Sequence, residues 1–108
     1  MGSSKRDLRA FPEKARQRAG FELYQVQLGL EPSDWKPMPS LGLGVREIRI
    51  HTGLERRVVY LTRLVDSVVV LHAFEKKTGR TPKRDIEVAR RRLTTALRMA
   101  QRGAIRRT

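Results

Sequence analysis

The hydrophobic and polar positions between residues 45 and 50 alternate as they do in a β-strand. Ile48 and Ile50 fall on one face of this segment, and Glu47 and Arg49 fall on the other. Such alternation is expected of a strand that the rest of the protein covers on one side.

Two further segments, residues 57–64 and 68–74, are largely apolar at successive positions. Apolar runs of this length predict strands that are covered on both faces, as in the middle of a sheet. Turns around residues 52–53 and 66–67 separate the three segments. The sequence therefore predicts a three-stranded antiparallel meander.

Two helices are predicted before the strands. Ser4 can cap a short first helix, and Pro12 suits the first turn of a second helix that extends to about Leu28. The second helix has one apolar stripe, and Gly29 is its expected end. The proline- and glycine-rich stretch at residues 29–44 is predicted to be an extended connector.

A long helix is predicted after the strands. Thr81 and Pro82 fit its N-cap and first position, its apolar stripe runs from Ile86 to Ala100, and Gly103 is its expected end. The order helix, helix, meander, helix predicts an α+β domain. We expect the helices to cover one side of the sheet and the other side to stay open.

Length and composition limit the possible functions. With 108 residues the chain can form one domain, which we assign to residues 1–103, followed by a basic tail at residues 104–108. There is no cysteine, and two histidines alone cannot build a metal site, so no disulfide, metal ion or cofactor is expected. The sequence shows neither a signal peptide nor the roughly 20 apolar residues that cross a bilayer, which predicts a cytoplasmic protein without membrane contact.

The chain carries a strong excess of positive charge. Its 24 Lys and Arg residues against 11 Asp and Glu residues give a formal net charge of +13, which favours nucleic acid, ribosomes or acidic proteins as partners. Several cations lie in or beside the predicted strands, where a sheet would gather them on one surface with no acidic run to neutralise them. They are Arg46, Arg49, Arg57, Arg63, Lys76 and Lys77.

Such a group of cations could cleave RNA without a metal ion. The reaction needs a base for the 2'-hydroxyl proton, positive charge for the phosphorane, and an acid for the leaving 5'-oxygen. Lys76 and Lys77 are adjacent, and burial together with like charge would lower a lysine pKa. Arg49 and Arg57 fit phosphate clamps because arginine keeps its proton, and His51 titrates in the working range.

Each of these residues also has a structural interpretation. Any one arginine taken alone fits the solvated face of a sheet, and Lys76 and Lys77 fit a basic turn after a strand. His51 fits an exposed loop residue beside a glycine turn, and His72 fits a hydrogen-bonded core histidine inside an apolar strand. Phe74, at a strand end, fits either the core or a platform that stacks a base. Residue patterns alone predict an RNA-binding α+β domain.

Three segments extend this interpretation: LGLGVREIRI, RRVVYL and VVVLHAFEKKTGRTPKRDIEVARRRL, at residues 41–50, 56–61 and 68–93. They resemble the phage-derived branch of the RelE/HigB toxin family, over about residues 3–97. Members of this superfamily are toxins of type II toxin–antitoxin pairs, small basic α+β proteins that enter the ribosomal A site and cut mRNA. The resemblance implies mRNA and the ribosome as partners, together with an acidic or helix-turn-helix (HigA-like) antitoxin.

The resemblance also implies roles for particular residues. Arg57 would hold the phosphate, Lys77 would stabilise the transition state, and Arg49 would belong to the site, with Lys76 and Phe74 beside them. The protein would act as a monomer or in a toxin–antitoxin hetero-oligomer.

Three more residues complete the predicted site. We assign Arg46, Arg63 and His51 to RNA binding, together with Phe74. Relatives usually begin with a short strand before the segment GSSKRDLRAFP, with which this chain starts. Three explanations stay open: the start codon was assigned late, the chain is trimmed, or the sheet lacks an edge strand. No catalytic tyrosine occurs near the C-terminus, which leaves the general base open.

The alternative functions are a non-catalytic basic module that binds RNA or the ribosome, and a toxin that inhibits DNA gyrase.

Overall fold

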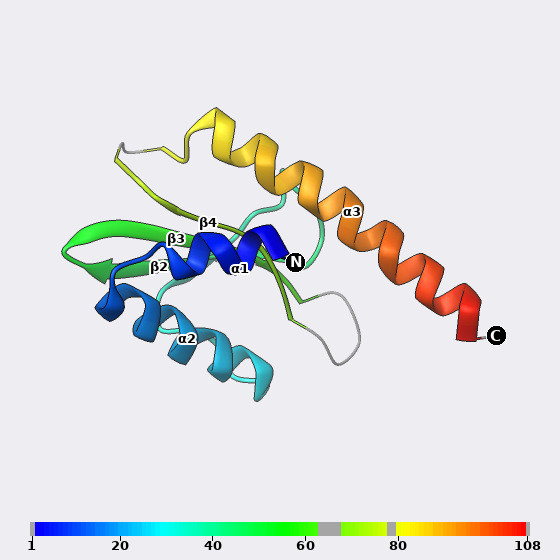
Figure 1. The fold of residues 1–108 in the computed structure, drawn as a ribbon, viewed down its shortest axis with the longest axis horizontal. Coiled ribbons are helices and arrows are strands. Elements are labelled where there is room, and N and C mark those ends of the chain that lie inside the picture. The colour runs from blue at the N-terminus through cyan, green and yellow to red at the C-terminus, as the bar shows by residue number, and fades with distance from the viewer. Residues whose placement is uncertain (1, 63–67, 78–79, 108) are drawn as a thin grey trace.

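The structure, a computed structural model, describes residues 2–62, 68–77 and 80–107. It confirms the α+β class, with helices before and after an antiparallel sheet (Figure 1). None of the described helices is long and apolar enough to cross a bilayer. The elements in chain order are α1 (Gly2–Arg9), α2 (Glu13–Gln27), β1 (Trp35–Pro37), β2 (Val45–Thr52), β3 (Leu54–Leu61), β4 (Val69–Glu75) and α3 (Lys83–Arg107).

The strands form one antiparallel sheet in the order β1-β2-β3-β4. Gly53 connects β2 to β3 with a φ of 98°, a left-handed conformation that a side chain would strain, so the predicted turn at residues 52–53 is confirmed. The turn predicted at residues 66–67 lies outside the described residues.

The prediction of a three-stranded sheet is wrong, because the connector contributes a fourth strand. β1 pairs with the outer side of β2, with Trp35 opposite Ile48. This strand is only three residues long and ends at Pro37, so it has no alternating pattern that could be recognised in the sequence. A proline is tolerated there because β1 lies at the edge of the sheet, where a missing N–H group breaks no ladder.

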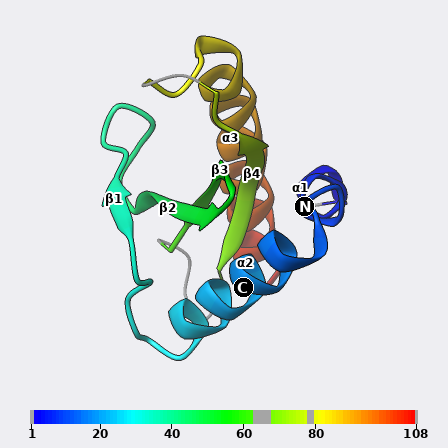
Figure 2. The same ribbon diagram turned by 90° about the vertical axis from the view of Figure 1, so that its left-hand side faces the viewer.

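Helices cover both faces of the sheet, whereas the sequence analysis expected one open face (Figure 2). Val58 and Tyr60 of β3 pack with residues of α1 and α2, while Val59 and Leu61 pack with residues of α3. Because β3 is apolar at successive positions, its side chains point alternately to the two faces, and both sets must be buried. The prediction that this strand is covered on both faces is therefore confirmed, and the expected open side is wrong.

Two of the predicted helix boundaries are also corrected. α1 begins at Gly2, so Ser4 lies inside the helix and not at the N-cap position that the sequence analysis expected. α3 continues through Gly103 to Arg107, because a glycine inside a helix costs only about 1 kcal/mol, and residues 104–107 of the predicted basic tail therefore belong to this helix. The end of α2 is as predicted, since Gly29 follows it with a φ of 84°.

Candidate functional site

Strand alternation and register bring several of the predicted cations to the α3 side of the sheet. Val45 of β2 packs in the core beneath α3, so Glu47, Arg49 and His51, at every second position after it, face the same side. Arg57 of β3 is the register partner of Arg49. The site is thus assembled at one end of the sheet, from side chains that are far apart in the sequence.

The carboxylate of Glu47 lies at the centre of this arrangement and is fully buried. Its Oε1 atom is 3.5 Å from Nε of Arg57 and 3.9 Å from Nζ of Lys36, a residue of β1. Its Oε2 atom accepts a hydrogen bond of 3.1 Å from the hydroxyl of Thr81. A buried carboxylate requires such partners, because an unpaired charge in the interior is strongly unfavourable. Thr81 therefore binds Glu47. The predicted N-cap is off by one residue, because α3 begins at Lys83 and the carbonyl of Pro82 accepts the first helical hydrogen bond.

Arg57 is held from two sides. Besides the ion pair with Glu47, its Nη1 atom donates hydrogen bonds of 2.9 Å to Oε2 of Glu55 and 3.1 Å to the main-chain carbonyl of Arg56. The side chain is only 7% exposed. Its planar guanidinium therefore has a fixed orientation within the site.

His51 links two carboxylates. Its Nε2 atom lies 2.6 Å from Oδ2 of Asp34 and its Nδ1 atom 2.7 Å from Oε1 of Glu55. These hydrogen bonds, that to Asp34 first, raise the pKa of His51 above its ordinary value of 6.5. The hydrogen bond to His51, followed by that to Arg57, lowers the pKa of Glu55. His51 lies in β2 and not in a loop as one interpretation held, and its side chain is 51% exposed.

Lys76 completes the group directly after β4, where its main-chain N–H donates a hydrogen bond of 2.7 Å to the carbonyl of Glu55. Burial lowers the pKa of its ammonium group, and the positive charges of Arg57, Lys36 and Arg49 lower it further, while Glu47 acts in the opposite direction. The sequence-based expectation of a lysine with a lowered pKa is thus confirmed for Lys76. The four cations Lys36, Arg49, Arg57 and Lys76, with Glu47 between them, are called the Glu47 cluster below.

A family model for the phage-derived Gp49-like proteins (DUF891) matches residues 6–94, which include the whole Glu47 cluster. The chain belongs to the phage-derived Gp49-like family. This family is related to the RelE-like toxins of toxin–antitoxin systems, so the resemblance found in the sequence is confirmed at that level. The finer assignment of this Gp49-like protein to the RelE/HigB branch stays a prediction. No curated protein matches the chain.

One of the predicted site residues of this Gp49-like protein, Arg46, lies away from the cluster. Arg46 is on the opposite face of β2, where its guanidinium lies 4.2 Å from the ring centroid of Trp35 in a cation–π contact. Arg63 lies outside the described residues. Lys77 follows Lys76, and its side chain is exposed.

The aromatic residues of β4 have structural surroundings. Phe74 is 8% exposed and belongs to the core beneath α3, which agrees with the core interpretation and leaves no open ring face for a base. It stacks on His72, with ring centroids 5.0 Å apart. His72 in turn is buried between two carboxylates. Its Nδ1 atom lies 3.3 Å from Oδ2 of Asp7 in α1, and its Nε2 atom lies 2.7 Å from Oδ1 of Asp85 in α3. It is the hydrogen-bonded core histidine that the sequence predicts.

The acidic partners are the main feature that the sequence analysis missed. It expected no acidic run beside the cations and did not foresee single carboxylates there. Oδ1 of Asp34 lies 3.8 Å from Nη1 of Arg49, and Glu55 and Glu47 contact Arg57. Asp34 belongs to the connector, and only the pairing of β1 with β2 brings it here. One signal was readable, since Glu55 follows His51 by four residues across the glycine turn. Among the described residues, no three His, Asp or Glu side chains form a group that could hold a metal ion.

Proposed function

We propose that this Gp49-like protein is the toxin of a type II toxin–antitoxin pair and cleaves mRNA in the ribosomal A site, in the cytoplasm. The cleavage would proceed by attack of the 2'-hydroxyl without a metal ion, leaving a 2',3'-cyclic phosphate and a 5'-hydroxyl. The observation that carries the proposal is the convergence of four cations from four chain segments on one end of the sheet, in the Glu47 cluster. Membership of a family related to RelE-like toxins supports it.

Arg57 and Arg49 would bind the scissile phosphate. The guanidinium of Arg57 is already oriented by Glu47 and Glu55, so it needs little reorganisation when charge develops on the phosphorane. The carboxylates of Asp34 and Glu55 contact these arginines and are 40% and 42% exposed. A bound phosphate would therefore compete with them for the two guanidinium groups.

Lys76 and His51 would exchange protons with the RNA. The lowered pKa of Lys76 increases the fraction of neutral amine, which would take the proton from the 2'-hydroxyl as its oxygen attacks phosphorus. The raised pKa of His51 keeps its imidazolium protonated to higher pH, so it would donate a proton to the 5'-oxygen as the bond from phosphorus to that oxygen breaks. The exposed ammonium of Lys77 would add positive charge for the phosphorane, the role implied by the family resemblance.

Mapping of cleavage products tests this proposal. Purified ribosomes carrying a defined mRNA are incubated with and without the protein, and new 5' ends are located by primer extension. The proposal predicts new ends that depend on both protein and ribosome, and upstream fragments that end in a cyclic phosphate. Stable binding to ribosomes without new 5' ends would instead identify a non-catalytic binding module.

A further inference from the structure

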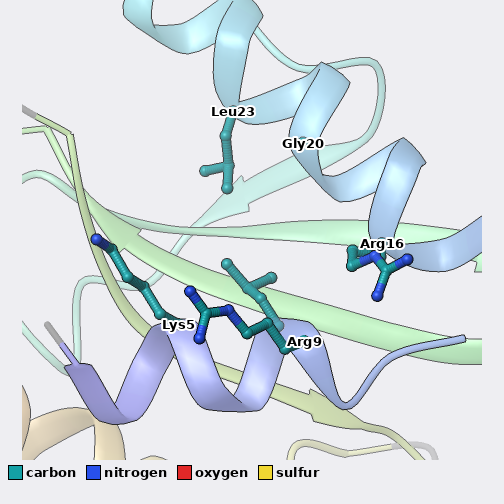
Figure 3. A pocket seen from close by; sticks show the side chains of 6 residues that line it. Lys5, Arg9, Arg16, Gly20 and Leu23 are labelled. Atoms are coloured by element: carbon teal, nitrogen blue, oxygen red, sulfur yellow. The ribbon is translucent and has the colours of Figure 1, made fainter. Parts of the chain in front are cut away.

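A groove separates α1 from α2 on the face of the sheet opposite the Glu47 cluster (Figure 3). It forms because α1 packs on β4 whereas α2 packs on β2, so the two helices lie on either side of β3. Its volume is about 230 Å³. The residues that line it are Lys5, Leu8, Arg9, Arg16, Gly20 and Leu23.

The groove is apolar inside and cationic at its rim. Leu8 and Leu23 pack against the core on this face of the sheet and form the apolar interior. Lys5 and Arg9 of α1 and Arg16 of α2 are exposed around it, and the lining contains no acidic residue (Figure 3). A ligand for this groove therefore combines apolar groups with negative charge.

The apolar surface continues from the groove over α2. Gly20 leaves the wall open, since a Cβ atom built there would meet nothing within 4 Å. Tyr24 and Leu28 follow Gly20 by one and two helical turns and are each 57% exposed. Phe21 and Leu30 are also exposed, so large exposed apolar side chains concentrate on α2 and the residues just after it. Apolar surface of this kind, bordered by charge, is typical of a protein interface.

We propose that this groove binds an acidic amphipathic helix of a protein partner, the antitoxin of the pair. An apolar side chain of that helix would enter between Leu8 and Leu23, and its carboxylates would pair with Lys5, Arg9 and Arg16. The volume exceeds the roughly 150 Å³ that accommodates a benzene-sized group in other proteins, so one leucine or phenylalanine side chain fits. The inference rests on the proposed function only in naming the antitoxin as the partner.

Substitution of Gly20 separates groove binding from general charge attraction. In Gly20→Phe the ring would fill the groove, whereas Gly20→Ala leaves most of it open. The probe is a fluorescein-labelled peptide of about 16 residues with leucine at helical spacing and glutamate beside it. We expect Gly20→Phe and the double variant Arg9→Glu/Arg16→Glu to weaken binding at least about tenfold, with Gly20→Ala within about twofold of wild type.

The double variant Arg90→Glu/Arg91→Glu on α3 is the matched control, because it changes net charge equally on another surface. Equal loss in this control, or unchanged binding by Gly20→Phe, would overturn the proposal. So would a single-stranded RNA that displaces the peptide and loses its own binding in Gly20→Phe, since the groove would then belong to nucleic acid.

If a helix-turn-helix gene lies beside the gene of this protein, its product can be tested as the antitoxin in cells. Gly20→Phe should still arrest growth, but co-expression of the antitoxin should no longer relieve the arrest. Normal relief would contradict the groove proposal. If the wild-type protein arrests no growth, the proposed toxin function fails, and the peptide measurement still decides whether the groove binds an acidic helix.

Discussion

The Nε atom of Arg57 lies 3.5 Å from Oε1 of Glu47, in a part of the sheet where both side chains are almost inaccessible to water. At this distance the two groups form an ion pair but no hydrogen bond. Lys36 and Thr81 contact the same carboxylate, which therefore holds two cations of the cluster, Arg57 and Lys36, beside each other. The buried carboxylate thus joins strands β1 and β3 at the centre of the cationic site.

Glu47→Gln should destabilise the protein strongly. The substitution removes the buried carboxylate partner of Arg57 and leaves only the half-exposed carboxylate of Glu55 beside its guanidinium. Breaking a buried pair in this way costs about 3–5 kcal/mol. Urea unfolding followed by circular dichroism measures the change. Glu87→Gln, at an exposed position of α3, is the control and should stay within about 0.5 kcal/mol of wild type. An equally small effect at Glu47 would show that the ion pair does not organise the site.

Lys76→Arg should change the pH dependence of RNA cleavage. If the neutral amine of Lys76 takes the 2'-hydroxyl proton, the wild-type rate rises with pH as its lowered pKa is passed. Arginine keeps the positive charge but does not lose its proton, so the rising limb should disappear. Single-turnover rates across a pH series measure this. The control variant Lys77→Arg should retain the rising limb of the pH–rate profile. A rising limb that persists in Lys76→Arg would exclude Lys76 as the base.

His51→Ala should flatten the pH dependence of stability. The pKa of His51 is raised above 6.5 in the folded protein. Its contribution to the free energy of unfolding is therefore fully present below that pH and is lost as pH rises through the folded pKa. The pKa of Glu55 is lowered from 4.5. Its contribution to the free energy of unfolding is therefore present above that pH and is lost only as pH falls through the folded pKa, so it does not change between the two pH values compared here. Wild type should therefore lose stability between about pH 5.5 and about pH 8.5 more than His51→Ala does. Urea midpoints at the two values test this, and identical changes in both proteins would contradict it.

Gly20→Ala should stabilise the protein by about 0.5–1 kcal/mol. Gly20 lies inside α2, where glycine is unfavourable relative to alanine, and the added methyl group meets no neighbour within 4 Å. Thermal or urea unfolding measures the gain. A loss of stability would mean that the groove wall is less open than the structure has it.

Periodicity was sufficient to predict β2, β3 and β4, because each is long enough to show an alternating or continuous apolar pattern. β1 could not be predicted in this way, since a three-residue strand ending at Pro37 exists only through its pairing with β2. The sheet was expected to have one open face because sequence alone does not show that α3 and the N-terminal helices pack on opposite sides.

The candidate site was predicted only in part, for the same reason. Arg49, Arg57 and Lys76 were recognised by their charge at strand ends. Lys36 was missed because its strand was missed, and the carboxylate partners depend on register. Alternation within β2 would have excluded Arg46. It lies three positions before Arg49, an odd number, so the two side chains face opposite sides of the sheet.

The single-turnover rate constant for mRNA cleavage on programmed ribosomes tests the central claim, that the Glu47 cluster is the site of RNA cleavage. Arg57→Ala should lower this rate about 100- to 1,000-fold, because it removes an oriented donor to the scissile phosphate. Lys77→Ala, at an exposed position, should lower it to a similar extent without affecting the fold, and Arg91→Ala on α3 should leave it unchanged. Wild-type rates in both Arg57→Ala and Lys77→Ala would contradict the assignment.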